Sequence, residues 1–431
     1  MEKPPLAIFA NAIAVRALLN ISARYFIVAL FFVSFVTIAR AEPLSFEAAI
    51  RQAMSDSPEV TAKEIQVEAT RSAAIPAGAL PDPKLFVGLD NYPVTGPNRG
   101  SFRDEMTMVT AGVMQELPNG DKRRARIARA QAEIGVATAE VAAHHREIGL
   151  AAALSWLDVF YAERRIAALE GLEAENRLLA DTVALRIASG SVTPAEAVAA
   201  PLQEASLADR RTALNAEAAR ARAEMRRWIG AAADEPLAQT VPNFVVDPGT
   251  LRMSLDAHPA LRVYESTLAR ASAETREAEA AKRPDLALQA GVHQRAPQFG
   301  WMVSAQVTID LPLFASTRQD PLIAAKVAEA NRIRVGRDAT RRRLAAELES
   351  GLANYAAVQE GLERIRETTL PLVRQKVELQ TASYRAGTAG FDVVLTSRRE
   401  RVETELTAIE REAETAKAAA RLTLNFGSDI P

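Results

Sequence analysis

One stretch of the sequence, from about residue 121 to about residue 189, contains no proline and predicts a single very long helix. At 1.5 Å per residue such a helix is about 100 Å long, whereas a helix of a globular protein averages about 11–12 residues. Isoleucine or valine recurs in it every seven residues, at Ile127, Ile134, Val141 and Ile148. A seven-residue apolar repeat is typical of a helix that packs along other helices as a coiled coil.

A second row of small residues accompanies this repeat. Alanine stands three residues after most of the apolar positions, at Ala130, Ala137 and Ala151, and His144 fills the remaining place. Alanine in this row allows neighbouring backbones to approach closely. For His144 a packed or hydrogen-bonded histidine is the favoured interpretation, because His145 is its direct neighbour and the two lack the i,i+4 spacing of a helical zinc pair.

A second long helix is predicted at about 319–386. Pro321 falls in its first turn, where proline is tolerated. Pro371 lies in its interior and predicts a kink. Aromatic residues make up only 5% of the chain, a composition that fits long helices better than a compact aromatic core.

The composition also excludes several classes of function. A formal net charge of −2 argues against nucleic-acid binding driven by bulk charge. The chain has no cysteine, which excludes disulfides and thiolate metal sites. We find no catalytic constellation, no cofactor motif and no set of metal ligands, so we expect that the protein is not an enzyme.

The first 41 residues predict a secretory signal peptide. Arg16 and Arg24 precede an apolar run at 25–38, and Ala39 and Ala41 supply a small-x-small cleavage site. An uncleaved anchor is the alternative, although the run is short for a membrane-spanning helix. No later stretch is apolar enough for such a helix, so a mature chain that spans a membrane is expected to do so with β-strands.

The remainder of the chain predicts a tandem duplication, with a first repeat at 42–230, a linker at 231–250 and a second repeat at 251–431. Landmarks recur in order: Pro58 with Pro259 and Pro83 with Pro284, each 201 residues apart, then Gly190 with Gly387 and Gly230 with Gly427, each 197 residues apart. Each repeat reads as helix, two strands, long helix, turn and helix. The predicted strands lie at about 84–92, 104–117, 285–294 and 299–311, and the helices that follow the long ones lie at about 195–229 and 391–426.

The strand pairs alternate apolar and polar residues. Leu286, Leu288 and Val292 alternate with Gln289 and His293, which places His293 on the polar face. Strands of about 9–11 residues can cross a bilayer, and one apolar face would meet the lipid. A soluble antiparallel sheet shows the same alternation and is the alternative. Four strands cannot close a barrel, so we expect several copies to share one, and three copies would give twelve strands.

The duplication, the long helices and two segments together resemble the TolC family of outer-membrane efflux ducts. The segments are Tyr384 to Thr388, at the end of the second long helix, and its counterpart Arg186 to Gly190. Residues 79–85 and 114–123 are similar to the heavy-metal branch of that family. The resemblance implies a mainly helical protein with a β-barrel part, in which antiparallel coiled-coil helices form a periplasmic α-barrel below a shared twelve-strand barrel in the outer membrane.

The resemblance also implies partners. It implies a homotrimer that docks to a periplasmic adaptor protein and an inner-membrane pump of the resistance-nodulation-division type, with heavy-metal cations as cargo and outer-membrane lipid around it. The helical turns would be the periplasmic tips, where the adaptor binds or the tunnel narrows. The candidate tip residues are Arg186, Gly190, Tyr384, Arg385, Gly387 and Asp392.

Some features leave alternatives open. A duct for drugs or proteins in the same fold, or a periplasmic coiled-coil scaffold without a pore, would fit much of the pattern. Met106, Met108 and Met114 fall on one face of a strand and suggest either a soft-metal contact or adaptable packing. A cationic cluster opens the first long helix, and contact with anionic lipid headgroups or a solvated face would each account for it. The cluster is Lys122, Arg123, Arg124, Arg126 and Arg129.

Overall fold

The computed structural model of the chain describes residues 43–102, 104–188 and 194–427. The predicted signal peptide therefore lies outside the described residues. Internal contacts divide the chain into two units, and the described residues of the smaller are 43–44 and 235–237. In its described part, Leu44 and Leu237 form a parallel bridge, and the Leu44 N–H donates to the carbonyl oxygen of Pro236 at 2.8 Å.

The larger unit carries the long helices and the strands, and it is described here by itself. Its first half contains α2 (Phe46–Asp56), α3 (Pro58–Ala74), the short η1 (Ile75–Gly78), β1 (Lys84–Asp90), β2 (Met108–Leu117), α4 (Gly120–Ala188), α5 (Pro194–Ile229) and η2 (Gly230–Asp234). β2 begins four residues later than the sequence predicted. The reason is local, because Asp104 accepts hydrogen bonds from Asn98 and from the backbone N–H of Met106, which hold this stretch in a loop.

The second half repeats the order of α-helices and strands, except that its long helix is divided into two. It contains α6 (Pro248–Ser254), η3 (Leu255–Ala257), α7 (Pro259–Ala280), β3 (Leu286–Gln294), η4 (Pro297–Phe299), β4 (Trp301–Ile309), α8 (Gln319–Arg364), η5 (Ile365–Thr369), α9 (Leu370–Arg385) and α10 (Phe391–Phe426). Across the two halves, side chains accept hydrogen bonds at the starts of four helices. Ser45 caps α2, Ser57 caps α3, Asp247 caps α6 and His258 caps α7. A proline follows the cap of α3, α6 and α7.

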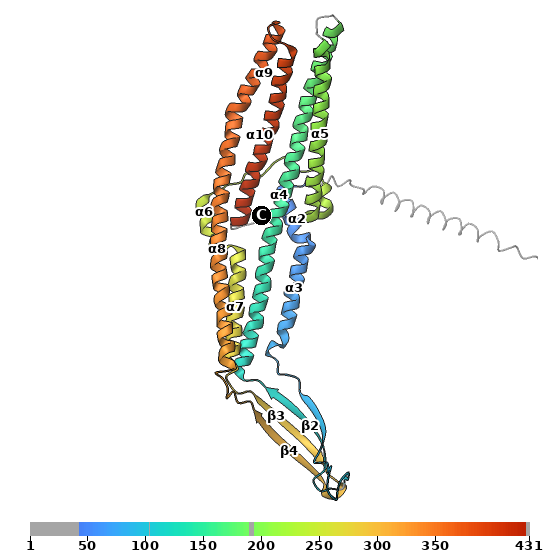
Figure 1. Ribbon diagram of the computed structural model, residues 1–431, viewed down its shortest axis with the longest axis vertical. Coiled ribbons are helices and arrows are strands. Elements are labelled where there is room, and N and C mark those ends of the chain that lie inside the picture. The colour runs from blue at the N-terminus through green and yellow to red at the C-terminus, as the bar shows by residue number, and fades with distance from the viewer. Residues whose placement is uncertain (1–42, 103, 189–193, 428–431) are drawn as a thin grey trace, which may run out of the picture. The chain divides into compact units, whose positions relative to one another are not determined.

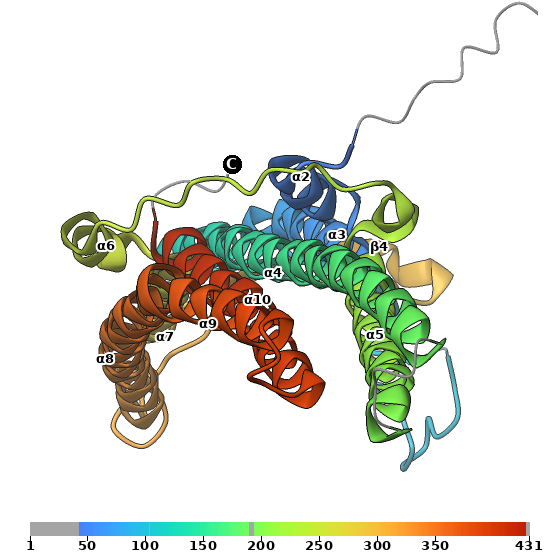
Figure 2. The same ribbon diagram turned by 90° about the horizontal axis from the view of Figure 1, so that it is seen from above.

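Helix α4 is the element on which the larger unit is assembled, and it contacts α2, α3, α5, α7 and α10 (Figure 1). Ala130 and Ala137 of the predicted small-residue row are buried, as a close approach of helices requires. His144 is half-buried, and its Nδ1 lies 3.4 Å from the Glu147 carboxylate, which agrees with a packed histidine. Seen from above, the helices form a curved array (Figure 2).

Aromatic packing fixes the short helix α2 on α4. Trp156 is fully buried, with the Phe46 ring edge-on at 5.6 Å and the Phe160 ring stacked at 5.2 Å. A second apolar cluster, around Leu261, Leu348 and Phe426, joins α7, α8 and α10. The core therefore runs as a series of clusters along the helices.

The second long helix passes Pro371 without ending. Residues Ile365–Thr369 form a π-helical turn between α8 and α9, and the Leu370 N–H donates to the carbonyl oxygen of Ile365. Proline has no N–H to donate and its ring crowds the carbonyl four residues earlier. A local π-turn accommodates both effects, so the disturbance predicted at Pro371 takes the form of a wider turn.

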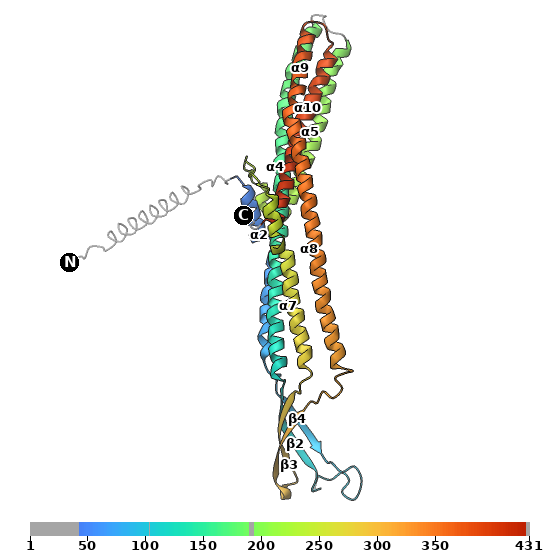
Figure 3. The same ribbon diagram turned by 90° about the vertical axis from the view of Figure 1, so that its left-hand side faces the viewer.

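The four strands form one antiparallel sheet in the order β1-β2-β3-β4. The sheet joins the two halves of the chain, since β2 pairs with β3 from Val109 opposite Gln294 to Leu117 opposite Leu286. It lies at the end of the unit opposite to the turn between α9 and α10 (Figure 3). Among the described residues, none of the helices has the length and apolarity that crossing a bilayer requires.

Candidate functional site

The sheet has one apolar and one polar face, because directly opposed residues of antiparallel strands project to the same side. Large apolar side chains, between 41% and 80% exposed, share one face: Leu85, Val87, Leu89, Val109, Val113, Leu286, Leu288, Val292, Trp301, Val303, Val307 and Ile309. An exposed apolar patch of this extent indicates a surface that is covered by lipid or by another protein.

The opposite face carries polar side chains: Lys84, Asp90, Thr110, Glu116, Gln289, His293, Ser304, Gln306 and Thr308. The strand register thus places His293 on the polar face, as the alternation predicted. At the end near the helices, Lys84 and Glu116 form an ion pair. Near the middle, the ring of Phe86 lies over two glycines, Gly112 and Gly291, whose missing side chains make room for it.

The sheet is joined to the helices by a hydrogen-bonded lock between the two repeats. Asp285, just before β3, accepts hydrogen bonds from the backbone N–H of Asn119 at 2.8 Å and from its side-chain amide at 2.9 Å. The Lys122 ammonium group contacts the other carboxylate oxygen at 2.7 Å. Burial opposes ionisation of Asp285, but the bonds from Lys122 and Asn119 outweigh it and hold its pKa below the ordinary value.

The cationic cluster at the start of α4 bonds mainly within the protein. Arg126 and Arg129 both bind the Glu277 carboxylate of α7, at 3.0 and 2.9 Å. Arg123 donates to the carbonyl oxygen of Gly78. These acceptors account for positive charge at a helix N-terminus, where it would otherwise be disfavoured. Arg124, which is 74% exposed, is the member that remains most available to an anionic headgroup.

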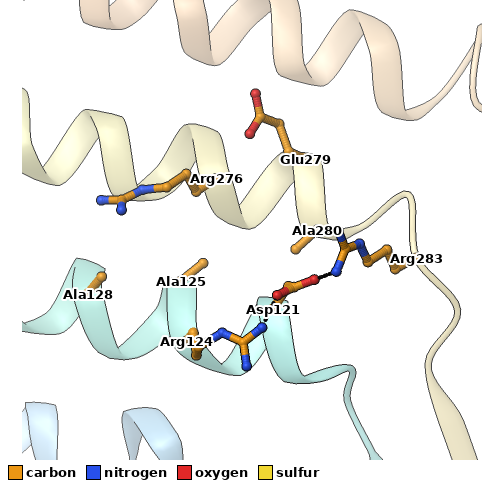
Figure 4. A pocket seen from close by; sticks show the side chains of 8 residues that line it. All are labelled: Asp121, Arg124, Ala125, Ala128, Arg276, Glu279, Ala280 and Arg283. Atoms are coloured by element: carbon orange, nitrogen blue, oxygen red, sulfur yellow. Dashed lines mark hydrogen bonds and ion pairs between the residues drawn. The ribbon is translucent and has the colours of Figure 1, made fainter.

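Arg124 borders a pocket of about 370 Å³ between α4 and α7 (Figure 4). Its lining is highly charged and consists of Asp121, Arg124, Ala125, Ala128, Arg276, Glu279, Ala280 and Arg283. Asp121 forms ion pairs with both Arg124 and Arg283, so the charges of the pocket largely neutralise one another. We therefore interpret the pocket as part of the contact between α4 and α7.

The turn between α9 and α10 is closed by its backbone. Gly387 has φ of 76°, its N–H donates to the carbonyl oxygen of Tyr384, and the Thr388 N–H donates to that of Ser383, both at 3.0 Å. This pair of bonds is a Schellman motif, and its left-handed residue favours glycine. The Tyr384 ring packs at 5.4 Å from the ring of Phe391, which is buried at the start of α10.

The other candidate tip residues differ in how far they are described. Arg385 is exposed in the last turn of α9, and Asp392 is exposed in the first turn of α10, so each charge complements its helix dipole. Gly190 and the side chain of Arg186 lie outside the described residues. The structure thus brings Tyr384 and Gly387 into one turn, and no contact with the other hairpin's tip is described.

Sequence reasoning missed the Asn119–Asp285 lock and the hydrogen bonds that cross the polar face, since both depend on how distant strands align. Pro118 and Pro284 directly precede Asn119 and Asp285 in the sequence, but they do not indicate the bond between the two residues. Within 43–102, 104–188 and 194–427, no group of three histidine, aspartate or glutamate side chains could hold a metal ion.

Comparisons with known proteins agree with this architecture. The family model described as outer membrane efflux protein matches residues 49–231 and 250–428. The cobalt-zinc-cadmium resistance protein CzcC of Cupriavidus metallidurans is 23% identical over 371 residues, which cover 83% of this chain and 84% of that protein.

Solved structures are similar in fold. The crystal structure of CusC superposes with a TM-score of 0.77 at 16% identity, covering 89% of this chain and 92% of CusC. The outer membrane protein VceC of Vibrio cholerae gives a TM-score of 0.73 at 15% identity, covering 90% of this chain and 97% of VceC.

Proposed function

Because this chain belongs to the outer membrane efflux protein family, we propose that it is the passive exit duct of a tripartite efflux system. The duct would lead from the periplasm across the outer membrane, and its energy would come from an inner-membrane pump of the resistance-nodulation-division type. The single observation that carries this proposal is a sheet with an exposed apolar face and a polar face at one end of the long helices.

Closure of the sheet requires further copies of the chain. β1 and β4 are the edges of the sheet, and each has a backbone row that pairs with no strand among the described residues. Unpaired edges are not tolerated in lipid. Pairing of β4 with β1 of the next copy would close a ring, and three copies give twelve strands with the apolar face outward and the polar face lining a lumen.

The opposite end of the helices supplies the docking surface in this proposal. The turn at Gly387 would meet the helical hairpins of a periplasmic adaptor protein, together with its counterpart at Gly190. Arg385 and Asp392 are exposed near this turn and are suited to recognise a charged partner. Tyr384 supports the turn through Phe391. In the first repeat, Arg186 is a basic residue shortly before Gly190, as Arg385 is shortly before Gly387.

Heavy-metal cations are the proposed cargo. Support comes from the similarity to CzcC, whose name records cobalt-zinc-cadmium resistance, and from the segments at 79–85 and 114–123. The exit of drugs or proteins through the same fold is the nearest alternative. A scaffold without a pore is a weaker alternative, because it leaves the apolar face of the sheet without a purpose.

Conductance of the purified protein in a planar lipid bilayer tests the duct. We expect discrete channels from a preparation whose mass in detergent corresponds to three chains. A soluble monomer without channels would overturn the proposal in favour of a scaffold. Cargo is tested separately in a deletion strain, where sensitivity to zinc, cobalt or cadmium without sensitivity to drugs supports heavy-metal export.

A further inference from the structure

A hydrogen-bonded row crosses all four strands on the polar face. It joins Asp90 of β1, Thr110 of β2, His293 of β3 and Ser304 of β4. The Thr110 hydroxyl group contacts the Asp90 carboxylate, and its oxygen lies 2.8 Å from His293 Nδ1. His293 Nε2 lies 2.7 Å from the Ser304 hydroxyl oxygen. Thr110, in the middle of the row, is only 4% exposed.

The chemistry of the groups gives the row one direction. The carboxylate of Asp90 can only accept, so the single hydroxyl proton of Thr110 is donated to it. Thr110 must then accept from His293, which places a proton on Nδ1. The row therefore ends on the exposed carboxylate of Asp90, which Thr110 holds directly and His293 and Ser304 hold through Thr110.

The row lies at the end of the sheet remote from the helices, because β1 ends at Asp90. Two charged residues near this end of the sheet, Arg295 and Asp104, have partners of their own. Arg295 turns into the β3–β4 loop, where it donates to the carbonyl oxygen of Phe299 at 2.9 Å and lies over the Phe299 ring. Asp104 bonds with Asn98 in the other loop. Asp90 thus places a carboxylate at the rim of the polar face.

We propose that Asp90 is a cation-selectivity residue at the outer mouth of the duct, with Thr110, His293 and Ser304 as positioning residues. The proposal rests on the shared barrel of the proposed function, in which three copies of Asp90 form a ring of carboxylates. Such rings enrich cations and deplete anions at a pore mouth. The row keeps each carboxylate against the wall and outside the path of the cargo.

The size of the effect follows from geometry. Twelve strands about 4.8 Å apart and tilted by about 40° give a backbone radius of about 12 Å, which puts the carboxylates about 10 Å from the axis. Three charges at that distance in water, screened at about 0.1 M salt, change the ratio of cation to anion on the axis by about fivefold. At about 1 M salt the same ring changes it by less than about 1.3-fold.

Reversal potentials in planar bilayers test this inference, with a twofold KCl gradient centred near about 0.1 M and then near about 1 M. We expect Asp90→Asn to lower the potassium-to-chloride permeability ratio by about fivefold in dilute salt and hardly at all in concentrated salt. Asp82→Asn removes the same charge beside the helical end of β1 and is the matched control, with a smaller effect expected.

Two variants of His293 distinguish a role in positioning the Asp90 carboxylate from a role in folding. His293→Leu removes the donor to Thr110 and is expected to lower the permeability ratio in dilute salt by less than Asp90→Asn does. His293→Asn can present its amide N–H from the same distance along the side chain as His293 Nδ1, and is expected to retain the ratio. Trimer yield and single-channel conductance in concentrated salt should be equal for the two His293 variants. Equal values would show that both variants fold, so that a difference in permeability ratio reports the position of the Asp90 carboxylate.

Two results would overturn the inference. One is an unaltered ratio for Asp90→Asn channels in dilute salt. The other, which needs no variant, is a ratio for the natural protein that does not fall between dilute and concentrated salt. Absence of any channel from the natural protein would refute the proposed duct itself, and with it the ring.

Discussion

Replacement of Gly112 by alanine tests the close packing of the polar face. A Cβ atom at Gly112 would stand 2.3 Å from Phe86 Cζ, 2.5 Å from the carbonyl oxygen of Ala290 and 2.8 Å from the Cα of Gly291. The ring of Phe86 can move, but the two backbone atoms belong to the paired strand β3 and cannot move without breaking the ladder. We therefore expect the Gly112→Ala protein to be destabilised by about 1–3 kcal/mol per copy, the usual cost of overpacking.

Gly291 is the matched control, since it lies directly opposite Gly112 on the same face. There a Cβ atom would meet Phe86 Cζ and Ser304 Oγ at 3.4 Å, which is within reach of ordinary contact. Gly291→Ala is expected to change the free energy of unfolding by less than about 0.5 kcal/mol. Adding Phe86→Leu to Gly112→Ala should restore only part of the stability, because the contacts with the β3 backbone remain.

The assay is the temperature at which the detergent-solubilised oligomer dissociates, measured by gel mobility and by circular dichroism at equal protein concentration. Dissociation of the Gly112→Ala protein at a clearly lower temperature than the Gly291→Ala protein is the expected result. Equal temperatures for the two variants would refute the reasoning, since they would mean that the sheet relaxes around an added methyl group.

Three further outcomes follow from the helices and the joint. Trp156→Ala should cost about 3–5 kcal/mol by thermal unfolding, because it empties the fully buried centre of the α2–α4 contact. Asp285→Asn should lower the free energy of unfolding by about 1–3 kcal/mol, because it leaves Lys122 without its charged partner. The double variant Asp285→Asn with Lys122→Met should recover part of that free energy. Burial, assisted by the charge of Arg146, lowers the pKa of His258. The contribution of neutral His258 to the free energy of unfolding should therefore be complete above about pH 6.5, the ordinary pKa of histidine, and should be lost as the pH falls through the lowered pKa of the folded protein. His258→Asn keeps a cap and should remove this dependence in unfolding curves measured between neutral and acidic pH.

The sequence predicted the ends of the long helices to within a few residues, because local signals mark them. α4 begins at Gly120 after Pro118, and α9 ends before Gly387, whose positive φ a glycine serves best. The apolar repeat needs no knowledge of distant partners, since it is a property of the helix itself. The two faces of the strands followed from alternation in the same way.

Features that depend on distant residues could not be predicted from one sequence. Asn119 and Asp285 are 166 positions apart, and nothing local to either indicates the bond between them. The row through Thr110 and His293 requires the register of β2 against β3, which alternation leaves open. The π-turn before Pro371 was anticipated only as a kink, because a proline can be accommodated in several ways.

The Asn119–Asp285 lock also has a mechanical consequence. It lies at one end of α4, whose 69 residues make a lever about 100 Å long. A tilt of one degree at the lock would therefore displace the far end of the helix by about 1.8 Å. Small changes in the side chains of the lock would thereby be amplified into movements longer than a covalent bond at the far end of α4.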